Sequence, residues 1–120
     1  MTETPLPVDG LFEPFAVKSL QPRNRFAMAP MTRAFSPDGI PGEDVAAYYR
    51  RRAAGGVGLV ITEGTYIPDP VAGSHTRVPL LYGQDSLAGW KSVVDAVHEE
   101  GGQIIPQLWH LASNAARSRV

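Results

Sequence analysis

The sequence contains no cysteine, and this absence excludes several kinds of chemistry. Disulfide scaffolds, thiolate zinc sites and catalysis by a nucleophilic thiol all require that residue. Charge of one sign is also lacking, because 11 Lys and Arg stand against 12 Asp and Glu, for a net charge of -1. Proteins that bind nucleic acid or an anionic membrane surface usually carry a basic excess, so we expect neither as a partner.

Long apolar runs are missing as well. No segment approaches the roughly 18 apolar residues of a membrane-spanning helix. Residues 1–10 include Glu3 and Asp9 and lack the apolar stretch of a secretory signal. The sequence therefore predicts a globular, cytoplasmic chain. Its 120 residues are under half of the roughly 250 that a closed (β/α)8 barrel uses.

Glycine and proline, by contrast, are frequent and divide the chain into segments. The first 24 residues carry four prolines and predict an extended arm with at most a short hairpin. Residues 25–111 alternate between apolar runs and helical patterns. The predicted strands cover 25–29, 57–62 and 103–109, and the predicted helices cover 43–54 and about 85–100. Such alternation predicts an α/β fold with a parallel sheet, either a barrel or an open sheet.

Capping and burial can be predicted for both helices. Gly55 suits the position after the first helix, and Asp85 or Ser86 can cap the start of the second. In the second helix, apolar residues recur at helical spacing and predict one buried stripe. Its members are Leu87, Trp90, Val93, Val94 and Val97.

The three predicted strands each end in residues that could bind a ligand. Thr32 follows the first strand and offers a hydroxyl, Gly64 follows the second and offers an accessible backbone N–H, and Gln107 lies in the third and offers an amide. Carboxyl ends of parallel strands meet at one edge of a sheet, where ligands bind. This set matches the polar edge of an isoalloxazine ring, although Gln107 and Trp109 could equally be interior residues without a ligand.

Several separate motifs resemble the Old Yellow Enzyme family of FMN-dependent oxidoreductases. The resemblance runs from about Leu11 to Leu111, with the motifs in order and at the right separations. They are Leu11–Pro14, Asn24–Arg33, Tyr48–Tyr49, Arg51–Ala53, Gly55–Thr65, Gly89–Trp90, Val94, Val97–His98 and Pro106–His110.

The resemblance implies that the chain is the N-terminal β-α-β-α-β part of a (β/α)8 TIM barrel, incomplete in this chain. It implies FMN as cofactor, with NAD(P)H as the reductant and an activated alkene of the enone type as the substrate. The implied FMN-binding residues are Pro30, Met31, Thr32, Gly64 and Gln107. Trp109 would shape the substrate pocket, and no metal is implied.

The same resemblance implies that much of the site lies downstream. The family's substrate-binding His pair, its proton-donating Tyr and its phosphate-binding loops all fall beyond this chain, so no catalytic residue is assigned here. His110 receives no role, and residues 112–120 depart from the family pattern as a tail of uncertain origin. Activity would then need the remaining barrel segment, in cis or in trans. The alternative is a non-catalytic barrel fragment that self-associates or pairs with another chain.

Overall fold

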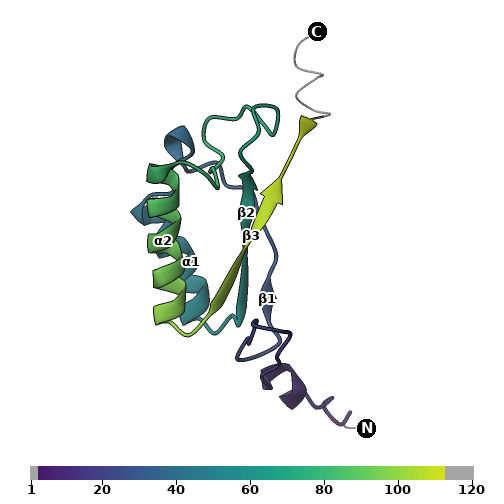
Figure 1. Cartoon of the computed structure of the whole chain (residues 1–120). Coiled ribbons are helices and arrows are strands. Elements are labelled where there is room, and N and C mark those ends of the chain that lie inside the picture. Colours follow the sequence, from purple (N-terminus) through teal and green to yellow (C-terminus); the bar gives the residue numbers. More distant parts are fainter. Residues whose placement is uncertain (1–2, 113–120) are drawn as a thin grey trace.

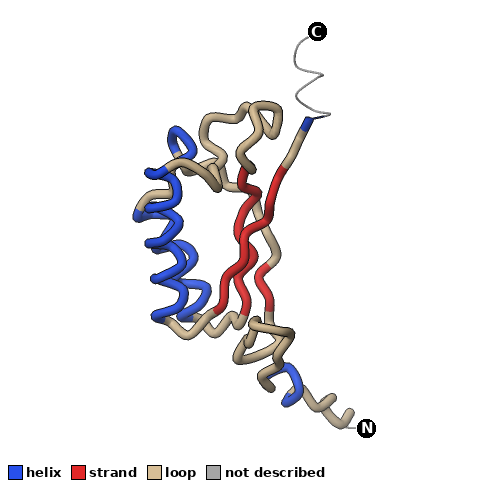
Figure 2. Tube along the Cα trace, in the orientation of Figure 1, coloured by secondary structure: helices blue, strands red, loops and turns tan. Residues whose placement is uncertain are grey.

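Two helices lie against one face of a three-stranded parallel sheet in the computed structural model, which describes residues 3–112 (Figures 1 and 2). The opposite face of the sheet carries no helix from the described residues (Figure 2). The elements, in chain order, are a 3-10 helix at Asp9–Phe12, β1 at Ala27–Met28, a 3-10 helix at Pro37–Gly39, α1 at Glu43–Ala54, β2 at Leu59–Tyr66, α2 at Gln84–Glu99 and β3 at Gln103–Trp109. The predicted alternation of strands and helices is confirmed.

The strands are arranged in the order β1-β2-β3, and both neighbouring pairs are parallel. In this register Ala27 lies beside Leu59, and Leu59 lies beside Gln103. The central strand is therefore β2, and the carboxyl ends of all three strands point toward the same end of the sheet.

The main core lies between the helices and β2. Tyr49 from α1, Val60 from β2 and Val97 from α2 are fully or almost fully buried in one cluster. The predicted stripe on α2 is correct for three positions and wrong for Leu87, which is exposed. Ser86 is buried beside it, because its hydroxyl donates a hydrogen bond of 3.0 Å to the carbonyl oxygen of Gly39. Buried stripe members are Trp90, Val93 and Val97, while Val94 is half-buried.

Two strands differ in length from the prediction. β1 is shorter, because the backbone N–H of Phe26 donates to Asn24 Oδ1 at 3.0 Å instead of to a neighbouring strand. β2 begins two residues later and continues to Tyr66, because its last three residues pair with the end of β3. β3 has the predicted limits.

The end of α1 and the start of α2 both differ from the capping that the sequence predicted. Gly55 is right-handed, with φ of -74°, and the left-handed residue after α1 is Gly56, with φ of 109°. α2 begins after Gly83, so neither Asp85 nor Ser86 is its cap. The sequence alone does not show which glycine of the pair adopts the positive φ, because either one tolerates it.

The arm before β1 forms a short hairpin with an antiparallel bridge between Val17 and Leu20. The predicted tail at 112–120 lies, apart from Ala112, outside the described residues. Within residues 3–112 no helix has the length and apolar character needed to cross a membrane.

Candidate functional site

The carboxyl ends of β2 and β3 bring three of the predicted site residues together. Gly64 pairs directly with Gln107, and Trp109 lies two residues further along β3 beside Tyr66. The end of β1 leads toward the same place, because the charge of Arg33, the residue after Thr32, lowers the pKa of the Glu63 carboxyl. The sheet topology thus brings the chain segments of Thr32, Gly64 and Gln107 to one end.

Exposure differs among these residues in a way that suits a binding site. Pro30, Met31 and Thr32 follow β1 and are exposed, and Met31 is 59% exposed. Gln107 and Trp109 are half-buried. The backbone N–H of Gln107 donates to Thr62 Oγ1 at 3.2 Å, and this bond anchors the backbone at this position.

A β-bulge in β2 lies immediately before Gly64. Ile61 pairs with Ile105 and Gly64 pairs with Gln107, so three steps on β2 match two steps on β3. The Thr62 hydroxyl stabilises the bulge, because it donates to the Glu63 carbonyl oxygen at 2.8 Å while it accepts the N–H of Gln107. Bulges redirect side chains and are frequent beside active sites.

The structure leaves no room for a side chain at Gly64. A Cβ at this position would lie within the indole ring of Trp109. The side chain that comes closest to the Gly64 backbone is therefore Trp109 of the neighbouring strand, which packs directly on it. The Trp109 ring also lies at 6.3 Å from the ring of Tyr66, in a tilted arrangement.

The second residue of the bulge, Glu63, carries a buried carboxyl group. It is 1% exposed, and its Oε2 accepts a hydrogen bond of 2.8 Å from the hydroxyl of Tyr49. The same Tyr49 hydroxyl accepts the backbone N–H of Glu63 at 2.9 Å. Burial raises the pKa of Glu63, and the Tyr49 hydrogen bond and the charge of Arg33 oppose that rise. Burial likewise raises the pKa of Tyr49, so its hydroxyl stays protonated and donates.

Arg33 supplies a positive charge that lowers the pKa of this carboxyl. The backbone N–H of Arg33 lowers it as well. Its guanidinium stacks over the Tyr48 ring, with Cζ 3.6 Å from the ring centroid. Within residues 3–112, Glu63 Oε1 and Arg33 Nη1 are both buried without a hydrogen-bond partner. Such groups are rare in proteins, and here two of them adjoin the predicted site.

The donors and acceptors at this end suit the polar edge of a flavin. An isoalloxazine ring presents one N–H between two carbonyl groups, with its reactive nitrogen nearby. A carboxamide such as that of Gln107 both donates and accepts, and a hydroxyl or backbone N–H can donate to the remaining acceptors. The described residues contain no cluster of three or more His, Asp or Glu side chains able to hold a metal ion.

One further polar pair lies beside the end of β3. His110 Nε2 is 3.2 Å from Asp69 Oδ2, and both side chains are well exposed. The pKa of Asp69 is lowered by the backbone N–H of Val71 and then by His110. Salt bridges at such exposure contribute little to stability.

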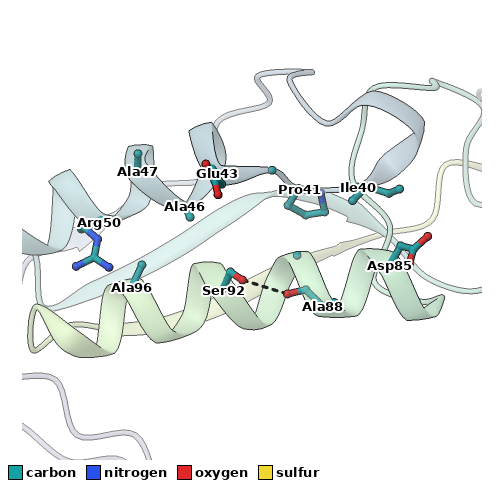
Figure 3. A pocket seen from close by; sticks show the side chains of 12 residues that line it. Ile40, Pro41, Glu43, Ala46, Ala47, Arg50, Asp85, Ala88, Ser92 and Ala96 are labelled. Atoms are coloured by element: carbon teal, nitrogen blue, oxygen red, sulfur yellow. Dashed lines mark hydrogen bonds between the residues drawn. The ribbon is translucent and has the colours of Figure 1, made fainter.

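A separate groove of about 570 Å³ lies between α1 and α2 (Figure 3). Its walls are mostly small side chains, including Ala46 and Ala88, with Asp85 toward one end, Arg50 toward the other and Glu43 between them. The groove lies in the helical layer, whereas the predicted residues lie at the strand ends. It is not part of the candidate site.

Sequence reasoning missed Tyr49, Thr62 and Glu63. A signal was present, because Thr62-Glu63 interrupts an otherwise apolar strand with two polar residues. Polar side chains inside such a strand require buried partners. The partner of Glu63 lies 14 residues away in α1, and the strand pattern alone contains no information about which residue that is.

Comparison with known proteins agrees with the fold and with the resemblance. Residues 10–119 match the NADH:flavin oxidoreductase / NADH oxidase family. The chain is 42% identical over 101 residues to 12-oxophytodienoate reductase 7 of Oryza sativa subsp. japonica, covering 84% of this chain and 25% of that protein. It is 42% identical over 100 residues to the chanoclavine-I aldehyde reductase of Penicillium roqueforti, covering 82% and 27%.

Solved structures give the same result. Morphinone reductase in complex with tetrahydroNAD is 44% identical and superposes with a TM-score of 0.77, covering 85% of this chain and 27% of that one. The Old Yellow Enzyme homologue from Zymomonas mobilis is 33% identical with a TM-score of 0.76, covering 84% and 28%. The chain thus spans about a quarter of the length of these relatives. Its α/β architecture is part of their TIM barrel, and the chain belongs to the NADH:flavin oxidoreductase / NADH oxidase family.

Proposed function

We propose that this chain supplies the first part of the flavin site of an FMN-dependent ene-reductase. Thr32, Gly64 and Gln107 would contact the polar edge of the isoalloxazine ring, and Pro30 and Met31 would line it. Trp109 would form a wall of the substrate pocket. The observation that carries this proposal is the direct pairing of Gly64 with Gln107 at the strand ends, next to the segment that holds Thr32.

The reaction itself would come from the cofactor. Bound FMN would accept a hydride from NAD(P)H and transfer a hydride to the β-carbon of an activated alkene, while a proton donor outside this chain protonates the α-carbon. The residues of this chain would bind and orient the ring. Hydrogen-bond donors such as Thr32 would also tune it, because they favour the more electron-rich reduced form.

The proposed activity requires the rest of the barrel. The chain's two neighbouring strand pairs leave one side of β1 and one side of β3 unpaired among the described residues. On and around the sheet, Ile105, Met31 and Leu108 are 37%, 59% and 57% exposed. A closed barrel removes unpaired strand edges and covers its interior side chains. The remaining segment could be joined in cis or bind in trans.

The test is a completed barrel, made by fusing residues 1–111 to the part of morphinone reductase that follows the matched region. We expect this protein to keep a visible flavin spectrum after desalting and to oxidise NAD(P)H when an enone is added. The matched control carries Gln107→Ala and should release FMN more readily. A completed barrel that folds but stays colourless with added FMN would overturn the proposal.

A second candidate function rests on the same unpaired edges and exposed apolar side chains. We propose that the 120-residue chain by itself associates with a second copy or with another chain, without catalysis. Open parallel edges and an uncovered apolar face favour association. Gel filtration of the isolated chain should then give a species larger than 12.9 kDa. A monodisperse monomer with cooperative unfolding would contradict this function.

A further inference from the structure

Resting on the proposed flavin site, we propose that Glu63 is a positioning residue for the cofactor. It lies between the two bulge neighbours Thr62 and Gly64, and it is held on the side of the sheet that α1 covers. Its role would be to hold the segments of Thr32 and Gly64 in a fixed relation to each other, without contacting the flavin itself.

The first link runs from Glu63 into the helical layer. The hydroxyl of Tyr49 donates to Glu63 Oε2 at 2.8 Å and accepts the backbone N–H of Glu63 at 2.9 Å. One side chain of α1 therefore fixes both the side chain and the backbone of the residue before Gly64. Tyr49 is itself 1% exposed, so this anchor has little freedom to move.

The second link runs from Glu63 to the segment after β1. The Arg33 guanidinium stacks over the Tyr48 ring at 3.6 Å, and that ring packs edge-on against Tyr49, the partner of Glu63. Thr32 precedes Arg33 directly and lies outside any strand, so no ladder of hydrogen bonds between strands holds its backbone. In place of that ladder, the segment after β1 would be held through Arg33, by its stacking on Tyr48 and by the action of its charge on the Glu63 carboxyl.

Other charged groups near the carboxylate do not alter this picture. Asp44 at the start of α1 is the further acid that acts on Glu63, and it raises the carboxyl pKa. Arg52 stacks on Tyr48, with Cζ 4.0 Å from the ring centroid. That ring therefore has Arg52 and Arg33 as cationic partners, and the stacking limits the movement of the Arg33 guanidinium.

The experiment compares variants of the completed barrel by flavin properties. Glu63→Gln keeps the shape of the side chain and removes its charge, and Tyr49→Phe removes the hydroxyl. We expect each variant to bind FMN roughly tenfold more weakly. We also expect a shifted visible spectrum and a more negative flavin midpoint potential, because Thr32 no longer donates from a fixed position. Combining Glu63→Gln with Thr32→Ala should shift the potential no further than Thr32→Ala alone.

The matched control is Thr65→Val, on the same strand. Thr65 is fully buried, and its hydroxyl donates to the carbonyl oxygen of Pro79 at 3.0 Å. This variant should lose stability and leave the flavin spectrum and potential unchanged. If the FMN-loaded Glu63→Gln protein has the parent's spectrum, potential and affinity, the positioning role is wrong. If Glu63→Gln does not fold, the same measurements on Tyr49→Phe test the positioning role by the same criterion. A parent that binds no FMN overturns the proposed function, and this inference with it.

Discussion

The two ends of the sheet use their polar groups in opposite ways. At the amino-terminal end, the Arg23 guanidinium donates to the carbonyl oxygens of Glu100 at 2.6 Å and of Ala53 at 2.5 Å, while the Asn24 amide donates to Gly56 at 2.6 Å. These donors all meet backbone acceptors, two of them at the carboxyl ends of α1 and α2. This end satisfies its own hydrogen bonds and stabilises the fold.

At the carboxyl-terminal end the polar groups are less completely paired. Thr32 is exposed and Gln107 is half-buried. Glu63 Oε1 and Arg33 Nη1 are buried without a hydrogen-bond partner among the described residues. In barrels of this class, stability is typical of the amino-terminal face and ligand binding of the carboxyl-terminal face. The comparison therefore predicts that substitutions at one end change stability, and substitutions at the other change flavin binding.

The largest stability change is expected from Arg23→Ala, which removes hydrogen bonds to two helix ends. The loss should be about 3 kcal/mol in the free energy of unfolding, because a charged donor is removed and carbonyl groups lose their partners. Urea unfolding of the completed barrel measures it. FMN affinity should stay within twofold of the parent. A large loss of flavin affinity in the folded variant would contradict the division between the two ends.

Gly64→Ala should change stability and flavin binding together. The added Cβ would collide with the Trp109 indole, so β2 and β3 must separate or the ring must move, at a cost of about 2 kcal/mol. Urea unfolding and FMN titration on the same samples measure both effects. Adding Trp109→Ala should recover part of the stability, since the ring that collides is gone. If Trp109→Ala recovers none of the lost stability, a contact other than the indole ring excludes a side chain at Gly64.

Gln107→Ala should act almost purely on the cofactor. The side chain is half-buried, so stability should change by less than about 0.5 kcal/mol, as for most surface substitutions. FMN should bind roughly tenfold more weakly, which corresponds to about 1.4 kcal/mol. Fluorescence titration of free FMN measures this. Unchanged affinity would remove Gln107 from the flavin site.

The raised pKa of Glu63 predicts a pH dependence of stability with a definite sign. The folded protein holds this proton more tightly than the unfolded chain, in which the carboxyl has its ordinary value of 4.5. Its contribution to stability is therefore complete below that value and declines as the pH rises through the folded pKa. Unfolding curves at a series of pH values should show that this decline disappears in Glu63→Gln. A decline of equal size in the variant would assign it to another group.

Asp69→Asn should have the smallest effect. The lowered pKa of Asp69, caused first by the Val71 backbone N–H and then by His110, gives a contribution that is present above the ordinary Asp range and lost as the pH falls through the lowered value. Both side chains of the pair are well exposed, so the change in unfolding midpoint at neutral pH should be near the limit of detection. A large destabilisation would show that the loop depends on this contact.

The sequence predicted most of what depends on order along the chain. Alternating strand and helix patterns led to the parallel sheet, and the rule that parallel strands end on one side led to Thr32, Gly64 and Gln107. These inferences need only local periodicity and topology. β3 has the predicted limits because it lies between one glycine pair and a polar tail.

The sequence did not predict features that depend on distant partners. Leu87 is exposed although it fits the helical stripe, and its neighbour Ser86 is buried instead and donates to Gly39, 47 residues earlier. The Tyr49–Glu63 contact similarly joins a helix to a strand across the core. Periodicity predicts which face of a helix or strand is buried, but it does not predict which residue a buried polar group will contact.

The bulge at Thr62–Glu63 also determines which residues of β2 face the inside of the barrel. Val60 packs in the core with both helices, and Glu63, three residues later, also faces α1. In an uninterrupted strand, residues an odd number of steps apart point to opposite sides. The extra residue reverses this parity, so Gly64 turns away from the helices. If the same residues formed a regular strand without the bulge, inside and outside would be exchanged for the last part of the strand, and Gly64 would turn into the helical layer.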